Sequence, residues 1–389
     1  MSPVVTTRLF TKFCVQTDGI RIDASAEQAY SKFYPEQPFT LAEYATTSGV
    51  ALRFENTGDH VCAPISAPAN LAAWRLVYRD DAFQLVRPSR SEPVHIYPVA
   101  AYKSRCGVTH TDRVRISPVG GCRWMCKFCD IPFTLDYRLA SRQELLDTVF
   151  EAAVDKLNPA RHALISGGVP KPKDEQWFDD TVAYLAEHSP IPIDIMMPPR
   201  PDLGYPRFLR GLGINALSCN LEVYDRDRAH LITPVKSKKF TLDYFFSYIE
   251  AAVEVFGTGF VQSLMVVGET IERAAETMRG IQELVKLDCI PVISPFVPDP
   301  STPFSNRPRP TWAEVDQVYR LTIEYCTAAG SHVLPGPRCV ADTWNTHAIQ
   351  LPRGIERYYG SGLYQDPVGF YVGPSEDLRV YRGHPRPKI

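Results

Sequence analysis

The sequence predicts an α/β protein in which a partial barrel of six strand and helix units follows a small β-rich domain and precedes an irregular C-terminal cap. Two observations carry this prediction. The pattern of apolar residues changes near residue 110, and beyond it strand-like runs alternate with helical stretches of ten to seventeen residues. A parallel pair of strands needs such a long crossover, so the alternation indicates a parallel sheet. We therefore expect domains at residues 1–110, 111–335 and 336–389.

The first domain contains mostly short strand-like runs, each bounded by Gly, Pro, Asn or Asp, the residues that commonly end strands. Helical patterning is brief there and is confined to Ala26–Phe33 and Leu41–Thr46. The predicted strands are Val50–Phe54, Trp74–Tyr78, Ala82–Val86 and His95–Val99. This domain carries no recognisable chemical motif, and we expect it to cover the barrel or to contact a partner.

The second domain alternates regularly between strands and helices. Its predicted strands are Arg113–Ser117, His162–Ser166, Ile191–Met196, Ile214–Cys219, Phe260–Val267 and Ile290–Val297. Helices are predicted from Ser141, over Trp177–Glu187, Tyr205–Leu212, Thr241–Phe256 and Thr270–Leu287, and from Thr311. Ser141 with Glu144, and Thr311 with Glu314, have the spacing of a capping box at a helix start. The stretch from residue 330 onward lacks periodicity, so we expect it to close the barrel as a cap.

Composition excludes several classes of protein. The 389 residues contain 42 Lys and Arg against 44 Asp and Glu, a net charge of −2 that offers no basic field for nucleic acid. No run of about eighteen apolar residues is present, so we expect no membrane span, and the first residues do not resemble a signal peptide. Ten cysteines in so long a chain indicate thiol or metal chemistry in a reducing compartment, so we expect a cytoplasmic protein.

The most informative residues are Cys122, Cys126 and Cys129, which directly follow the first strand of the alternating region. Loops at this end of barrel strands build active sites. Three thiolates can hold three irons of a four-iron cluster, which normally takes four cysteines, and one iron then stays open to another ligand. The alternative from the residues alone is a zinc site with a distant fourth ligand.

This loop resembles the signature of the radical S-adenosylmethionine (radical SAM) superfamily, Cys-x3-Cys-x2-Cys after the first strand of a TIM-like barrel. Phe128 stands where that family commonly has an aromatic residue. The resemblance implies a 4Fe-4S cluster whose open iron binds S-adenosylmethionine, reductive cleavage to a 5′-deoxyadenosyl radical, and hydrogen abstraction from a substrate. It also implies an electron donor such as flavodoxin or ferredoxin.

Further segments resemble the biotin synthase and lipoyl synthase branch. In that branch a Gly-Gly-Glu turn meets the amino group of the cofactor, and an Asn-Leu-Glu element reaches its ribose. The resemblance assigns these roles to Ser166, Gly167 and Gly168, and to Asn220 and Glu222. Val169 replaces the glutamate, so only the backbone role transfers. In that branch a basic residue also contacts the carboxylate of the cofactor, and we choose Lys238 for this role. The alternative is that the lysines of this segment are only solvent-exposed charges at the start of a helix.

The likeness covers roughly residues 113–335, and the segments Leu264–Thr270 and Ser294–Pro303 continue it in order. Two departures stand against sulfur insertion. Phe260 and Leu334 occupy positions where biotin synthase holds ligands of an auxiliary cluster. The N-terminal cysteines are too far apart for the trio of lipoyl synthase; they are Cys14, Cys62 and Cys106.

Five remaining cysteines pose the question of a second iron–sulfur cluster: Cys106, Cys219, Cys289, Cys326 and Cys339. Unpaired cysteines are usually buried as small hydrophobes, and that interpretation competes with the cluster. Cys339 is the best exception, which we expect near the barrel mouth. Asp194 is expected to point into the barrel, and His162 to be structural. Four side chains of the cap are candidates for binding an anionic or zwitterionic small molecule: Arg338, Trp344, His347 and Arg353.

The first functional hypothesis is a radical SAM enzyme that acts on a small molecule sealed inside the barrel. One alternative keeps the cofactor but modifies a peptide or protein, with the first domain as a docking module, or inserts sulfur through an auxiliary cluster. An alternative of another class is a non-catalytic zinc or iron–sulfur scaffold.

Overall fold

The computed structural model describes residues 3–40, 49–55, 59–66, 70, 73–90, 92–99, 103–110, 112–155, 159–339 and 341–348. The N-terminal part forms a six-stranded sheet with two helices, α1 (Pro3–Asp18) and α2 (Ala24–Phe33). Its strands, in the order β1-β4-β5-β6-β2-β3, are β1 (Ile20–Ile22), β4 (Trp74–Arg79), β5 (Ala82–Val86), β6 (Val94–Pro98), β2 (Gly49–Phe54) and β3 (His60–Pro64).

The prediction for this part was right for one helix and four strands. Helix α2 and strands β2, β4, β5 and β6 are at the expected positions. Helix α1 and strands β1 and β3 were not predicted, and the expected helix at Leu41–Thr46 lies outside the described residues.

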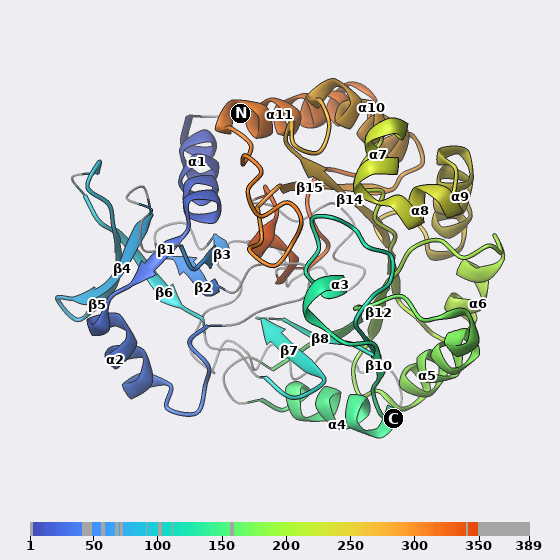
Figure 1. Cartoon of the computed structure of the whole chain (residues 1–389), viewed down its shortest axis with the longest axis horizontal. Coiled ribbons are helices and arrows are strands. Elements are labelled where there is room, and N and C mark those ends of the chain that lie inside the picture. Colours follow the sequence, from blue (N-terminus) through green and yellow to red (C-terminus); the bar gives the residue numbers. More distant parts are fainter. Residues whose placement is uncertain are drawn as a thin grey trace.

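The barrel sheet confirms the prediction of a partial α/β barrel. Six strands run parallel in the order β15-β14-β13-β12-β11-β8, and an antiparallel edge strand, β7 (Gly107–His110), joins β8. The parallel strands are β8 (Arg113–Ile116), β11 (His162–Ile165), β12 (Ile193–Met196), β13 (Ala216–Ser218), β14 (Val261–Val267) and β15 (Ile290–Pro295). Figure 1 shows the sheet curving around a central space with helices along its outer side.

Six helices pack outside the sheet at the predicted positions: α4 (Arg142–Ala153), α5 (Glu175–His188), α6 (Tyr205–Gly211), α9 (Leu242–Phe256), α10 (Ala274–Lys286) and α11 (Trp312–Ala328). Both expected capping boxes are present, at Ser141 and Thr311. The short elements α3 (Ile131–Thr134), α7 (Arg226–Ile232), α8 (Pro234–Lys239), η1 (Pro172–Asp174) and η2 (Ala341–Asn345) were not predicted, nor was the small antiparallel pair of β9 (Val119–Gly120) and β10 (Arg138–Leu139).

Side-chain alternation on β8 separates the core from the barrel interior. Val114 and Ile116 are buried in the apolar layer between sheet and helices, whereas Arg113 and Arg115 line an internal cavity. Successive residues of a strand point to opposite faces, which accounts for this division. The core therefore lies outside the sheet, and the space inside it carries polar and charged groups.

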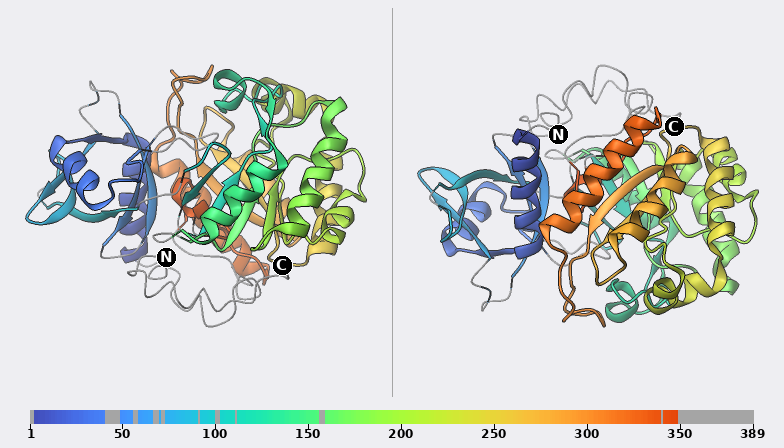
Figure 2. Two further views of the ribbon diagram at one scale, coloured as in Figure 1. Left: turned by 90° about the horizontal axis from the view of Figure 1, so that it is seen from below. Right: turned by 90° about the horizontal axis from the view of Figure 1, so that it is seen from above.

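Helix α1 joins the N-terminal sheet to the barrel (Figure 2). Phe13 packs in the barrel core and its ring lies 5.6 Å from that of Trp312. The ammonium of Lys12 is buried and donates to the carbonyl oxygens of Thr343 (2.5 Å) and Ala348 (2.6 Å). Burial lowers the pKa of Lys12 to about 7. The helix thus connects both the N-terminal sheet and the C-terminal segment to the barrel.

Candidate functional site

A cavity occupies the interior of the barrel. Phe128, Asn220 and Glu222 line it beside the cysteine loop, and Arg113 and Arg115 line it on the β8 side. The N-terminal part also contributes to its wall, through Gln16, Cys62 and Pro64. Residues far apart in the sequence therefore enclose one space.

The cysteine loop follows β8 and β9, as the sequence predicted, and all three of its thiols are partly buried. Its fold is fixed by backbone contacts: Cys129 N–H donates to the carbonyl of Cys126 (3.2 Å), and Lys127 N–H donates to the carbonyl of Ile232 in α7 (2.9 Å). Met125 has a φ of 55°, a left-handed conformation that a side chain seldom adopts. The loop is consequently held in one conformation by its neighbours.

The thiols of this loop lie near one another and near an ion pair. Burial raises the pKa of Cys126, with further contributions from Glu222, Cys129 and Cys122, while Lys236 acts in the opposite direction. Burial likewise raises the pKa of Cys129. Buried thiols of this kind become thiolates when a metal binds them.

The three sulfur atoms of the loop do not all lie within 4.8 Å of one another. Around a single tetrahedral zinc with bonds of about 2.3 Å, sulfur atoms would be about 3.8 Å apart. Within the described residues, one trio of potential ligand atoms has all its members within 4.8 Å of one another, and this trio is not the cysteine loop. The sulfur atoms are therefore farther apart than ligands of one zinc ion would be.

The glycine turn after β11 packs directly on the cysteine loop. Gly168 N–H donates to the carbonyl of Val119 (2.9 Å). Gly167 has a φ of +127°, and a Cβ added at Gly168 would lie 1.7 Å from the carbonyl oxygen of Gly121. Ser166 accepts a hydrogen bond from Arg115 Nη2 (3.1 Å). Glycine is needed at 167 and 168 because two backbones approach each other there.

Asn220 and Glu222 follow β13 and are held on β14. Asn220 Oδ1 accepts from the Leu264 amide (3.2 Å). Glu222 has a φ of 70°, and its amide donates to the carbonyl of Leu264 (2.8 Å) while its own carbonyl accepts from Val266 (3.0 Å). Its carboxylate forms an ion pair with Lys236 (Nζ to Oε2, 2.9 Å). A non-glycine residue held at positive φ is a strained arrangement of the kind that clusters at functional sites.

Lys238 does not join this group. Its side chain is exposed on α8, whereas Lys236, two residues earlier on the same helix, is buried and also donates to the carbonyls of Asn220 and Leu221. Residues two apart on a helix point about 200° apart, so both lysines cannot face the same site. The charge run was noticed in the sequence, but its phase could not be read because helices α7 and α8 were not predicted.

The sequence interpretation also missed two arginines that the structure brings to the cavity. Arg113 pairs with the carboxylate of Asp342, which also accepts from Gln262 Nε2 (3.3 Å). Arg115 lines the cavity beside Ser166. The signal was present in the sequence, because two arginines alternate with Val114 and Ile116 in a predicted strand.

Asp194 is on the inner face of the sheet, as predicted, because it is paired with Leu164, which lines the cavity. It does not line the described cavity; its carboxylate contacts Asn215 Nδ2 (3.3 Å), Arg338 Nη1 (3.3 Å) and His162 Nδ1 (3.0 Å). The charges of the interacting groups hold the pKa of Asp194 below its usual value, against the effect of burial. Asp194 is thus part of an internal polar network.

Three of the four candidate substrate residues of the cap are buried: Arg338, Trp344 and His347. Trp344 is buried and stacks on His60 with ring centroids 5.7 Å apart. His347 is buried against the rings of Phe13 and Tyr319. Arg338 is held by Asp194, and Arg353 lies outside the described residues. These residues were expected to bind a small molecule, but ring contacts bury Trp344 and His347, and Asp194 holds Arg338.

The remaining cysteines do not gather into a second cluster within the described residues. Four of them lie in the apolar core: Cys106, Cys219, Cys289 and Cys326. Cys339 lies with Asp112 and His162 instead, without another cysteine, and not near the cysteine loop. These four cysteines thus pack as small hydrophobes, which is the interpretation that competed with the cluster.

Comparison with known proteins identifies the central part of the chain. Residues 116–281 match the family model described as the Radical SAM superfamily. They form a radical SAM domain. The superfamily consists of enzymes that use a 4Fe-4S cluster and S-adenosylmethionine, so this part of the chain is a domain of an enzyme superfamily. The match is to the superfamily, so the biotin synthase and lipoyl synthase branch stays a prediction.

Solved structures show weaker likeness, and the chain spans about half the length of the first ones it matches. Coproporphyrinogen III oxidase (HemN) from Escherichia coli is 15% identical with a TM-score of 0.40, covering 57% of this chain and 53% of that one. Methylornithine synthase (PylB) is 19% identical with a TM-score of 0.40, covering 50% and 56%. The radical S-adenosylmethionine methyltransferase TsrM from Kitasatospora setae, with cobalamin and [4Fe-4S] cluster bound, is 12% identical with a TM-score of 0.41, covering 77% and 63%.

No curated protein matches the chain. Among the described residues, no helix combines the length and the apolar character needed to cross a membrane.

Proposed function

We propose that this radical SAM enzyme generates its radical at the cysteine loop and acts on a small anionic molecule inside the barrel. Cys122, Cys126 and Cys129 are the proposed ligands of the 4Fe-4S cluster. The observation that carries the proposal is the cavity itself, because Phe128 and Glu222 beside the cysteine loop and Arg115 on β8 line the same space. When bound, the cluster and S-adenosylmethionine would supply a 5′-deoxyadenosyl radical that abstracts hydrogen from the substrate.

The cofactor would be held by groups around the cysteine loop. The backbone of the turn at Ser166–Gly168 is proposed to meet its amino group. Asn220 and Glu222 are proposed to bind the ribose, since a carboxylate can accept from two hydroxyls. Lys236 holds the Glu222 carboxylate in place through a charge-assisted hydrogen bond of 2.9 Å. Because Lys238 is exposed, we assign it no contact with the cofactor in this proposal.

The substrate would lie deeper, toward Arg115. A guanidinium that lines a partly enclosed cavity favours a molecule with a carboxylate or phosphate group, which it can bind through two parallel hydrogen bonds. Gln262 and Ser294 line the same space and offer further polar contacts. Fixing one substrate hydrogen near the radical and excluding water give the reaction its selectivity.

The N-terminal part is proposed to act as a cover and not as a peptide-docking module. Gln16, Cys62 and Pro64 line the same cavity as the cofactor residues, which supports a role in closing the barrel. An external electron donor such as ferredoxin or flavodoxin in the cytoplasm would complete the system.

Anaerobic reconstitution tests the proposal. After incubation with iron and sulfide, the chain should hold about four irons, and with dithionite and S-adenosylmethionine it should form 5′-deoxyadenosine, detected by mass spectrometry. Cys126→Ala should lose both properties, whereas Cys14→Ala, which changes a cysteine of α1, should keep both. One zinc per chain without cofactor cleavage would favour the scaffold hypothesis and reject the proposal.

The substrate class needs its own measurement. Arg115→Met should leave the uncoupled formation of 5′-deoxyadenosine within about two-fold of wild type, and should abolish the increase that a carboxylated substrate produces. If substrates without an acidic group stimulate wild type and Arg115→Met equally, the anionic assignment is wrong while the radical chemistry stands.

A further inference from the structure

We propose that Asp112, His162 and Cys339 bind one divalent transition-metal ion, best matched by zinc, at the base of the barrel. This site is separate from the cysteine loop. Asp112 precedes β8 and His162 begins β11, so both lie at the starting ends of parallel strands, whereas the cysteine loop follows the far end of β8. The proposal therefore does not depend on the proposed radical chemistry.

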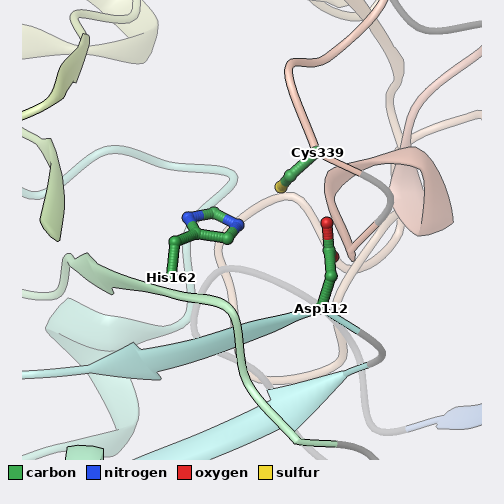
Figure 3. A group of neighbouring side chains, drawn as sticks. All are labelled: Asp112, His162 and Cys339. Atoms are coloured by element: carbon green, nitrogen blue, oxygen red, sulfur yellow. The ribbon is translucent and has the colours of Figure 1, made fainter. Parts of the chain in front are cut away.

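The fold brings the three ligands together from distant segments. Strands β8 and β11 are paired with His162 opposite Arg113, which places His162 next to Asp112. Cys339 arrives from the segment that follows α11. Figure 3 shows the three side chains pointing toward a common space. One potential ligand atom from each residue lies within 4.8 Å of the other two, and all three residues are at most 3% exposed.

The donor set and the spacing suit a single ion. A thiolate sulfur, an imidazole nitrogen and a carboxylate oxygen are all common zinc ligands, with bonds of about 2.0–2.3 Å. Ligand atoms around such an ion are about 3.3–3.8 Å apart, so atoms already within 4.8 Å need to move by only about an ångström. The cysteine loop does not meet this criterion.

Supporting hydrogen bonds are arranged as they are around metal-binding side chains. His162 Nδ1 lies 3.0 Å from Asp194 Oδ2, which directs the other ring nitrogen, Nε2, to the proposed ion. A histidine ligand that contacts a carboxylate through its second nitrogen is a common feature of metal sites. Asp112 Oδ1 accepts a hydrogen bond from the Ala341 amide (3.0 Å), and Arg338 forms an ion pair with Asp194. Arg338 and Ala341 lie before and after Cys339 in the sequence, so these contacts hold the segment that carries the thiol.

The position of the site gives the ion a structural task. It would join the starts of β8 and β11 to the segment that contains η2. That segment supplies Asp342 and Asn345 to the wall of the cavity. The metal would thus fix one wall of the substrate space without contacting the substrate.

Metal analysis of the full chain is the direct test. We would measure zinc by mass spectrometry in the Cys126→Ala background, in which the proposed cluster site is disabled. The expected result is about one zinc per chain, retained after dialysis. Adding Cys339→Ser should remove it, whereas adding Cys289→Ser, which changes another fully buried cysteine, should not. Asp194→Asn should weaken zinc binding about 10- to 100-fold, as loss of a supporting carboxylate does in other sites.

Cobalt gives a second measurement that needs no substitution at the proposed zinc site. Cobalt added to metal-free chain in the Cys126→Ala background should produce the absorption of a thiolate-to-cobalt charge transfer. Absence of this band together with less than about 0.1 zinc per chain would overturn the proposal. Zinc that survives Cys339→Ser would also overturn it. Zinc lost on the Cys126→Ala change would assign the ion to the cysteine loop and reject both this site and the proposed cluster.

Discussion

Gly168→Ala should destabilise the cysteine loop more than any other single methyl group added at a glycine in the described barrel. The turn at Gly168 and the loop at Gly121 are in backbone contact, and a Cβ at 168 would lie 1.7 Å from the Gly121 carbonyl oxygen. An ordinary contact begins at 3.4 Å, so the two segments would have to separate. Neither partner is a flexible side chain that could turn away.

The expected cost follows from two effects. Separation breaks the hydrogen bond from Gly168 N–H to Val119 carbonyl, which contributes about 1 kcal/mol. Forcing a methyl group into a packed position costs a further 1–3 kcal/mol, roughly. The sum, about 2–4 kcal/mol, is a large part of the 5–15 kcal/mol that usually stabilises a protein. Because the movement displaces Gly121, it also displaces Cys122.

Urea unfolding and iron content should therefore change together. Gly168→Ala should lower the free energy of unfolding by about 2–4 kcal/mol and should reduce the iron held after reconstitution to well below that of wild type. Gly211→Ala is the matched control, because Gly211 is exposed at the end of α6 and nothing lies within 4 Å of its added Cβ. That change should be neutral or stabilising by less than about 1 kcal/mol. A Gly168→Ala protein with the stability and iron content of wild type would refute the close approach.

Two further predictions concern a lysine and a histidine. Lys236→Met should weaken binding of S-adenosylmethionine about ten-fold or more in calorimetry, because Glu222 loses a charge-assisted hydrogen bond of about 1.5–3 kcal/mol. The control variant Lys238→Met should bind the cofactor as wild type does, since Lys238 is exposed. Equal effects of the two changes would show that Lys236 does not support cofactor binding. Burial lowers the pKa of His347 to about 3, whereas the pKa of a histidine in the unfolded chain is about 6.5. Protonation therefore favours the unfolded state, and the protein loses stability as the pH falls from about 6.5 toward 3. At pH 5 this loss is about 2 kcal/mol, so the free energy of unfolding should fall by about 2 kcal/mol less between pH 7.5 and 5 in His347→Phe than in wild type. In the control variant His332→Gln, which changes an exposed histidine, the fall should equal that of wild type. The same pH dependence of the unfolding free energy in all three proteins would contradict the burial of His347.

The barrel could be predicted because each of its units carries a local signal. A buried strand followed by an amphipathic helix recurs six times, and both expected capping boxes formed at Ser141 and Thr311. Helix α1 gave no such signal: it buries Lys12 and Gln16 as well as Leu9, so polar residues interrupt its apolar face. Its partners are strand β3, helix α11 and the C-terminal segment, which local patterning cannot reveal.

The two lysines of α8 show the same limit of local sequence patterns. The charge run from Lys236 to Lys239 was visible in the sequence, but its pairing with the Glu222 carboxylate was not predicted. Which lysine reaches the carboxylate depends on where α8 begins, and that is set by Thr233 and Pro234 at its start. A shift of two residues along a helix turns a buried ion pair into an exposed charge. Motif spacing therefore located the segment but could not select the residue.

The proposed zinc site illustrates a stricter limit. Cys122, Cys126 and Cys129 are close in sequence, so their spacing alone indicates a shared metal group. Asp112 and His162 become neighbours only through the pairing of β8 with β11, which parallel topology makes foreseeable once both strands are placed. Cys339 could not be placed in this way, because its segment has no periodicity. It was expected at the barrel mouth, but it packs beside Asp112 and His162 at the opposite end of the barrel. A metal site whose last ligand comes from an irregular segment can therefore be found only from the structure. Measuring the metal content of Cys339→Ser tests whether Cys339 is a ligand.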